Sequence, residues 1–120
     1  MNYENIDSCI IAAENIKETK IYDKARKHFG IPEEDDVFLI CDLTFWETCR
    51  RGFAICTSGF YCRGKGVKKS KSFSWEEFKT LSIYAKNALI VEDVCFITRD
   101  NLTANLEKLL KKIQRIVWNN

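Results

Sequence analysis

The chain has 120 residues, 46% hydrophobic and 30% charged, which predicts one globular domain whose core needs no metal or disulfide support. Its one Pro and five Gly disfavour a long flexible linker, and no apolar run reaches the roughly 18 residues of a membrane-spanning helix. The N-terminal stretch MNYENIDS lacks the basic and apolar regions of a signal peptide, so we expect a cytoplasmic protein.

Cysteine usage agrees with that expectation. The six cysteines include no CxxC pair, and the single histidine, His28, cannot complete a usual zinc set. We therefore expect free thiols, no metal site and no cofactor. Cys56 and Cys62 fall inside predicted strands, where cysteine behaves as a small buried hydrophobic residue.

The N-terminal part of the chain is predicted to be helical. Residues 3–18 place apolar side chains three and four positions apart, as on one face of a helix: Ile6, Cys9, Ile10, Ala13 and Ile16. A second helix is predicted for residues 20–29, and Gly30 and Pro32 end it. Thr19 either separates two helices or lies within one long helix.

The middle of the chain has the pattern of a meander of short antiparallel strands. Residues 37–41 form an apolar, β-rich block that is typical of a buried strand. Residues 42–51 are then a connection or an irregular strand. A tight turn at 58–59 predicts a hairpin between strands at 53–57 and 60–63, because glycine tolerates the positive φ of hairpin turns.

A third group of elements follows the polar, glycine-containing loop after the hairpin. Residues 71–75 alternate polar and aromatic side chains, as in a half-buried strand. Ser74 and Glu77 have the spacing of a capping box, which predicts one helical turn after this strand. Short apolar runs predict three further strands at 81–85, 88–91 and 94–98.

The chain ends in a predicted amphipathic helix at residues 101–118, capped by Asp100 or Asn101. Its apolar stripe consists of Leu102, Leu106, Leu109, Leu110, Ile113 and Val117. We therefore predict an α+β fold in which about six or seven antiparallel strands curl into a barrel that this helix caps. Residues 1–30 form a helical segment that packs on the barrel domain, residues 31–120.

The net charge of +2 conceals a basic stretch that follows the acidic run 33–36. Seven basic residues occur with no acidic residue among them: Arg50, Arg51, Arg63, Lys65, Lys68, Lys69 and Lys71. These residues are the candidate site for a partner or an anion. The loop that carries most of them is a solvated structural loop, a contact for protein or membrane, or a nucleic-acid contact in which Phe60, Tyr61 and Phe73 stack on bases.

The sequence offers little for catalysis. A cysteine nucleophile needs a neighbouring base, and His28 is predicted to lie exposed on a helix rich in Lys and Arg. The adjacent carboxylates at 76–77 and 33–36 are typical of solvated or capping groups. Residues 64–66, Gly-Lys-Gly, lack the strand-to-helix context of a phosphate loop. We therefore expect no enzyme activity.

The motifs of the central strands resemble those of small stand-alone bacterial proteins with a pleckstrin-homology-like (PH-like) fold. The pattern of those proteins, D-x-T-x-F, G-F-x-x-T, G-I-Y and I-x-W-x-E-I, is similar to the runs at 42–46, 51–55, 59–61 and 73–78. The resemblance covers residues 24–117 and implies the barrel-plus-helix fold. PH domains that bind phosphoinositides carry their basic cluster between the first two strands, whereas the most basic loop here, 63–71, follows the hairpin.

Together these observations predict a bacterial, non-enzymatic adaptor domain that binds another protein. The first alternative is an adaptor for anionic phospholipid that uses the basic loop 63–71. The second alternative is a small inhibitor or immunity-type protein that blocks a larger target.

Overall fold

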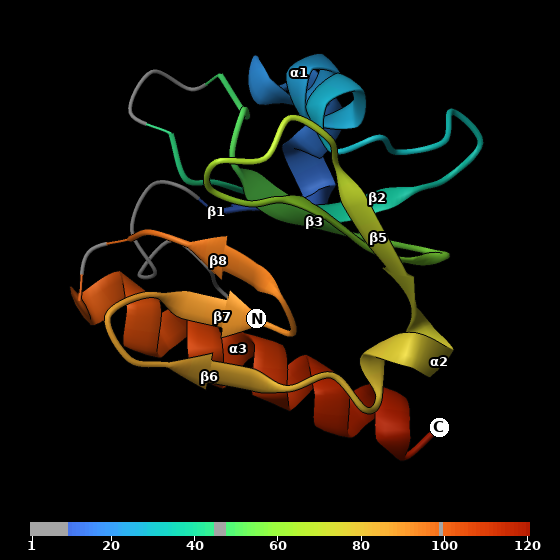
Figure 1. Cartoon of the computed structure of the whole chain (residues 1–120). Coiled ribbons are helices and arrows are strands. Elements are labelled where there is room, and N and C mark those ends of the chain that lie inside the picture. The colour runs from blue at the N-terminus through green and yellow to red at the C-terminus, as the bar shows by residue number, and fades with distance from the viewer. Residues whose placement is uncertain (1–9, 45–47, 99) are drawn as a thin grey trace.

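The computed structural model describes residues 10–44, 48–98 and 100–120, and within them two antiparallel sheets and three α-helices form an α+β fold. The larger sheet has the order β1-β2-β3-β4-β5 and the smaller one β6-β7-β8 (Figure 1). The strands of the larger sheet are β1 (Ile10–Ala12), β2 (Val37–Asp42), β3 (Gly52–Cys56), β4 (Gly59–Arg63) and β5 (Lys71–Ser74). Those of the smaller sheet are β6 (Ile83–Ala85), β7 (Leu89–Val91) and β8 (Val94–Phe96). The helices are α1 (Ile21–His28), α2 (Trp75–Phe78) and α3 (Asp100–Trp118), and a 3-10 helix, η1, spans Ala13–Glu18.

The middle strands of the larger sheet bury side chains on both faces, which explains the apolar residues Leu39, Ile40 and Cys41 of β2, although Phe38 is exposed. Ile40 and Ala54 point to one face, where they pack with Ile21, Ala25 and other side chains of the segment around α1. Alternate residues of the same strands point to the opposite face and join a cluster with the smaller sheet and α3. Figure 1 shows α1 above the larger sheet, and the smaller sheet with α3 below it.

The smaller sheet and α3 form the other half of the molecule. The stripe of α3 buries Leu102, Leu106, Leu109 and Leu110 against this sheet and the aromatic core. Glu107 of α3 also accepts a hydrogen bond from the amide of Ala85, 3.1 Å away, at the edge strand β6. The C-terminal helix predicted from the sequence is confirmed.

The predicted curled sheet is only partly correct, because the described strands form two separate sheets and no closed barrel, and they number eight rather than six or seven. The break falls at α2. Ser74 accepts a hydrogen bond from the Glu77 amide, and the Glu77 carboxylate accepts one from the Ser74 amide, so the predicted capping box is confirmed. This one-turn helix redirects the chain after β5, and β6 starts a new sheet.

The N-terminal prediction needs a larger correction. The part of the predicted 3–18 helix that is described contains β1 and then η1, and residues 1–9 lie outside the described residues. Strand β1 pairs antiparallel with β2 through Ile10 and Cys41. The edge of β2 supplies backbone hydrogen bonds that hold residues 10–12 as a strand. The helical spacing of apolar residues in the sequence could not predict this pairing. Thr19 does separate two elements, and α1 is found where the second helix was predicted.

The hairpin of β3 and β4 is confirmed, but its turn lies one residue earlier than predicted, at Thr57 and Ser58. Asp35 holds this turn, since its buried carboxylate accepts hydrogen bonds from the amide and the hydroxyl of Ser58. No helix in the described part of the chain is both long and apolar enough to cross a membrane.

Candidate functional site

The connection between β2 and β3 carries Arg50 and Arg51 and is fixed on both sides of them. Cys49 is fully buried with a positive φ of 54°, and its thiol donates a hydrogen bond to the carbonyl of Ile21, 3.6 Å away. Gly52 follows with a φ of 144°, and a Cβ there would lie 2.0 Å from the Cys41 carbonyl oxygen. These two constraints hold both arginines on the outside of the molecule.

A polar network holds the start of the same connection. The buried carboxylate of Asp42 accepts hydrogen bonds from the amide and the hydroxyl of Thr44, and the amide distance is 2.9 Å. The Thr44 hydroxyl oxygen in turn accepts a hydrogen bond from the Thr48 amide at 3.1 Å. Because the Thr44 hydroxyl already donates to Asp42, it positions the backbone and has no proton left for a ligand.

Hairpin register brings a third arginine beside these two. Arg63, the last residue of β4, pairs with Gly52 across the hairpin, so its backbone lies beside the residue that directly follows Arg51. Its Nε donates to the carbonyl of Val67, 3.2 Å away. That bond ties the guanidinium to the loop between β4 and β5.

The three arginines line one open groove of about 510 Å³, which we call the arginine groove. Its lining consists of Thr44, Thr48, Arg50, Arg51, Arg63, Gly64, Gly66 and Val67, with no acidic side chain among these described residues. Guanidinium groups offer paired N–H donors that match carboxylate and phosphate oxygens. The arrangement is therefore suited to binding an anion.

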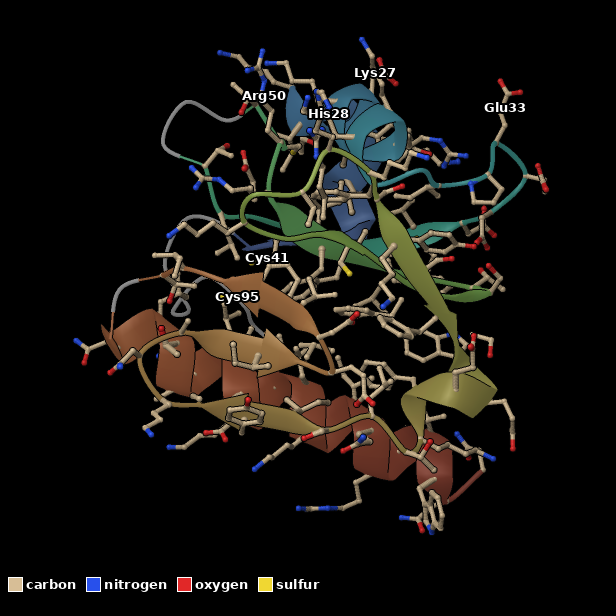
Figure 2. All side chains as sticks on the ribbon, in the orientation of Figure 1. Lys27, His28, Glu33, Cys41, Arg50 and Cys95 are labelled. Carbon is tan, nitrogen blue, oxygen red and sulfur yellow. The ribbon has the colours of Figure 1, made fainter. Side chains whose placement is uncertain are left out.

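His28 lies beside this groove, although the sequence predicts it to be exposed. It is the last residue of α1, it is partly buried, and its Nδ1 is 3.3 Å from Nη1 of Arg63. Burial, followed by the charges of Arg63, Lys27 and Arg50, lowers the pKa of His28 below its usual value. Figure 2 shows His28 and Arg50 on the same side of the molecule.

A second hollow of about 330 Å³, which we call the lysine hollow, adjoins the arginine groove and shares Gly64 and Val67 with it. It is lined by Gly64, Lys65, Val67, Lys69, Ser70, Lys71, Asp93, Val94 and Cys95. Lys71 Nζ donates to both carboxylate oxygens of Asp93, at 2.6 and 2.8 Å. The hydrogen bond from Lys71 lowers the pKa of Asp93 below its usual value.

The structure thus divides the predicted basic site into parts. Arg50, Arg51 and Arg63 meet in the arginine groove, whereas Lys65, Lys69 and Lys71 line the lysine hollow. Lys68 is exposed and lines neither hollow.

Sequence reasoning missed His28, Asp93 and the groove residues Thr44 and Thr48. The hairpin register, which pairs Gly52 with Arg63, was the available signal that the segments carrying Arg51 and Arg63 are neighbours. The contacts of His28 and Asp93 carried no such signal, because they join elements that are far apart in the chain.

The cysteines confirm the prediction of buried thiols in strands. Burial raises the pKa of Cys56 and that of Cys62 to about 12, so both thiols stay protonated at neutral pH. Cys56, Cys62 and the partly buried Cys95 are free thiols. In the described ranges, no three His, Cys, Asp or Glu side chains gather as a metal site would require.

Comparisons with protein-family models, with curated proteins and with solved structures each found no match to this chain.

Proposed function

We propose that the chain is a non-enzymatic binding domain that engages an acidic segment of another protein through the arginine groove. The observation that supports this most directly is the convergence of three arginines on one groove with no acidic side chain in its described lining. Arginine is favoured at protein interfaces because its planar fork makes paired hydrogen bonds to carboxylates. The constraints at Cys49 and Gly52 keep the arginines in place before a partner arrives, which lowers the entropy cost of binding.

The proposed fold family is the PH-like one, in a bacterial and cytoplasmic protein. The described arrangement of the four-strand meander β2 to β5, a three-stranded sheet and a C-terminal helix supports this proposal. The sequence placed the most basic loop after the hairpin, away from the usual position in lipid-binding PH domains. In the structure, however, Arg50 and Arg51 from the connection between β2 and β3 share a groove with Arg63.

A comparative pull-down tests the proposed function. The wild-type chain, a variant with Arg50, Arg51 and Arg63 changed to Gln, and a control with Lys108, Lys112 and Arg115 changed to Gln are used as baits. The control removes the same charge from exposed positions of α3. We expect one dominant partner, retained at moderate salt, to bind the wild type and the control but not the groove variant. A partner that binds all three baits equally would contradict the role of the groove.

One observation favours a second function, the contact with an anionic membrane surface. Val67 is 48% exposed in the loop between β4 and β5, and the exposed Lys65, Lys68 and Lys69 lie around it in the sequence. An apolar side chain among lysines can enter the headgroup region while the lysines contact anionic lipid, and each contributes about 1 kcal/mol.

Sedimentation with vesicles of phosphatidylserine and phosphatidylcholine tests this second function. We expect the wild type to sediment at low salt and a variant with Lys65, Lys68 and Lys69 changed to Ser to remain in solution. A wild type that stays in solution at low salt would exclude the membrane function. It would leave the protein-binding function intact, because the arginine groove does not include these lysines.

A further inference from the structure

The contact between His28 and Arg63 fixes which groups carry protons in the ligand-free groove. Nη1 of Arg63 lies 3.3 Å from Nδ1 of His28, and a guanidinium can only donate. Nδ1 must therefore accept, which requires a neutral imidazole with its proton on Nε2. A protonated His28 would have a proton on both ring nitrogens and could not accept this hydrogen bond.

The charged groups that act on His28 come from three parts of the fold. They are Lys27 on α1 itself, Arg63 at the end of β4 and Arg50 in the connection between β2 and β3, and all of them are positive. Each disfavours a further positive charge on the imidazole. Two of them, Arg50 and Arg63, line the arginine groove.

An anion in the groove acts on the same groups. Its negative charge offsets Arg50 and Arg63, so it weakens the repulsion that keeps His28 neutral. Protonation of His28 in turn ends the hydrogen bond from Nη1 of Arg63 and leaves that donor available to the anion. The anion therefore favours protonation of His28, and protonation of His28 favours binding of the anion.

We infer that anion binding in the arginine groove is coupled to protonation of His28, so that the groove binds its partner more tightly as the pH falls through the titration range of this histidine. The inference rests on the proposed function, since it requires the groove to bind an anion. Coupling between two binding events is reciprocal, so the anion must raise the pKa of His28 by as much as protonation strengthens anion binding.

This coupling gives His28 the role of a positioning residue. In its neutral form it occupies one donor of Arg63, and in its protonated form it releases that donor and adds a positive charge beside it. A partner with a doubly charged anionic group gains more from this change than one with a single carboxylate.

The test is a pH titration of His28 by NMR with and without sulfate. His28 is the only histidine in the chain, so its imidazole signal needs no assignment by mutation. Sulfate is the probe because it stays doubly negative across the range used, and any pH dependence then belongs to the protein. Sodium chloride keeps the ionic strength constant, since salt screens these charges.

We expect sulfate to raise the pKa of His28 and the affinity for sulfate to increase about threefold to tenfold between about pH 8 and about pH 5.5. In His28→Gln the amide oxygen can still accept from Arg63 but does not titrate, so the affinity should vary little with pH. The control Arg115→Gln removes a charge from α3 and should keep the wild-type dependence.

The outcomes separate the inference from the proposed function. If the guanidinium signals of Arg50, Arg51 and Arg63 do not respond to sulfate at any pH, the groove does not bind anions and both are overturned. If those signals respond while the pKa of His28 stays constant, or if His28→Gln keeps the wild-type pH dependence, the coupling alone is overturned.

Discussion

The arginine groove and the lysine hollow share Gly64 and Val67 of one loop, and both contain positive side chains, but they differ in what surrounds those charges. In the hollow, Lys71 is paired with Asp93 at 2.6 Å, so part of the positive charge is already neutralised. In the groove, the described lining has no carboxylate, and Arg63 is held by a carbonyl and a neutral imidazole. This lack of a carboxylate in the described lining, rather than the number of basic residues, is why we propose the arginine groove as the anion site.

The comparison also shows why a basic stretch in a sequence is a poor measure of a basic surface. The residues from Arg50 to Lys71 form one run without acidic interruption, yet the fold distributes six of its seven basic side chains over two hollows and leaves Lys68 outside both. Asp93 comes from the turn between β7 and β8 and changes the character of one hollow only.

The largest expected effect is on stability and comes from Gly52→Ala, which disturbs the connection that carries two arginines of the groove and leaves the lysine hollow unchanged. The new Cβ would lie 2.0 Å from the Cys41 carbonyl oxygen at a φ of 144°, so Arg51 and the start of β3 must move. We expect a loss of about 3 kcal/mol in the free energy of unfolding. Chemical denaturation measures it.

Gly66→Ala is the matched control for that substitution. Gly66 also has a positive φ, of 76°, but a Cβ there would meet no atom within 4 Å. We expect a loss of about 1 kcal/mol from the backbone conformation alone. Equal losses for both variants would show that the close approach at Gly52 does not constrain the connection.

The next effect concerns binding and compares one residue from each region. Arg63→Gln should weaken sulfate binding about tenfold or more, because it removes charged hydrogen-bond donors from the groove. Lys71→Gln should change it by less than about twofold, because Lys71 is already paired with Asp93. Isothermal titration at constant ionic strength measures both affinities. If Lys71→Gln weakened sulfate binding more than Arg63→Gln, the lysine hollow rather than the arginine groove would be the stronger sulfate site.

A smaller effect is expected from Asp93→Asn, which makes the hollow resemble the groove. Removing the carboxylate releases Lys71, so sulfate should begin to shift the NMR signals of Lys71 and its neighbours in the hollow. The shifts at Arg50, Arg51 and Arg63 should remain as in the wild type. If the hollow gains no sulfate response, pairing with Asp93 is not what distinguishes the two regions.

The smallest expected effect is a pH dependence of the free energy of unfolding, caused by His28 at the edge of the groove. The pKa of His28 is lowered in the folded protein, so the unfolded chain binds more protons as the pH falls through about 6.5, the usual histidine value. The wild type should therefore lose stability on acidification through this window, and His28→Gln should lose less. Denaturant unfolding of both proteins across the window measures the difference, and parallel losses would contradict the lowered pKa.

Local patterns in the sequence predicted most of the fold. The alternation around the hairpin, the capping box of Ser74 and Glu77 and the stripe of α3 all depend on residues close together in the chain. Strand β1 was missed because its structure depends on the edge of β2, with Ile10 paired to Cys41. The break between the two sheets was missed because the strands were assumed to continue past α2.

The candidate site was predictable only in part. Its arginines were selected as part of a basic run, and the pairing of Gly52 with Arg63 in the hairpin places the end of β4 beside the residue that follows Arg51. His28 reaches Arg63 because α1 packs on the same face of the sheet as Ala54 and Ile40, a contact between distant segments. Sequence periodicity places neither His28 nor Asp93.

An NMR titration that follows the arginine Nε–Hε and lysine Nζ signals as sulfate is added tests the central claim most directly. The claim is that the three arginines of the groove form the anion site and the lysines of the hollow do not. We predict saturable shifts at Arg50, Arg51 and Arg63, with small, non-saturating shifts at Lys65, Lys69 and Lys71. Saturation at the lysines first, or equal shifts at every basic residue, would contradict the claim.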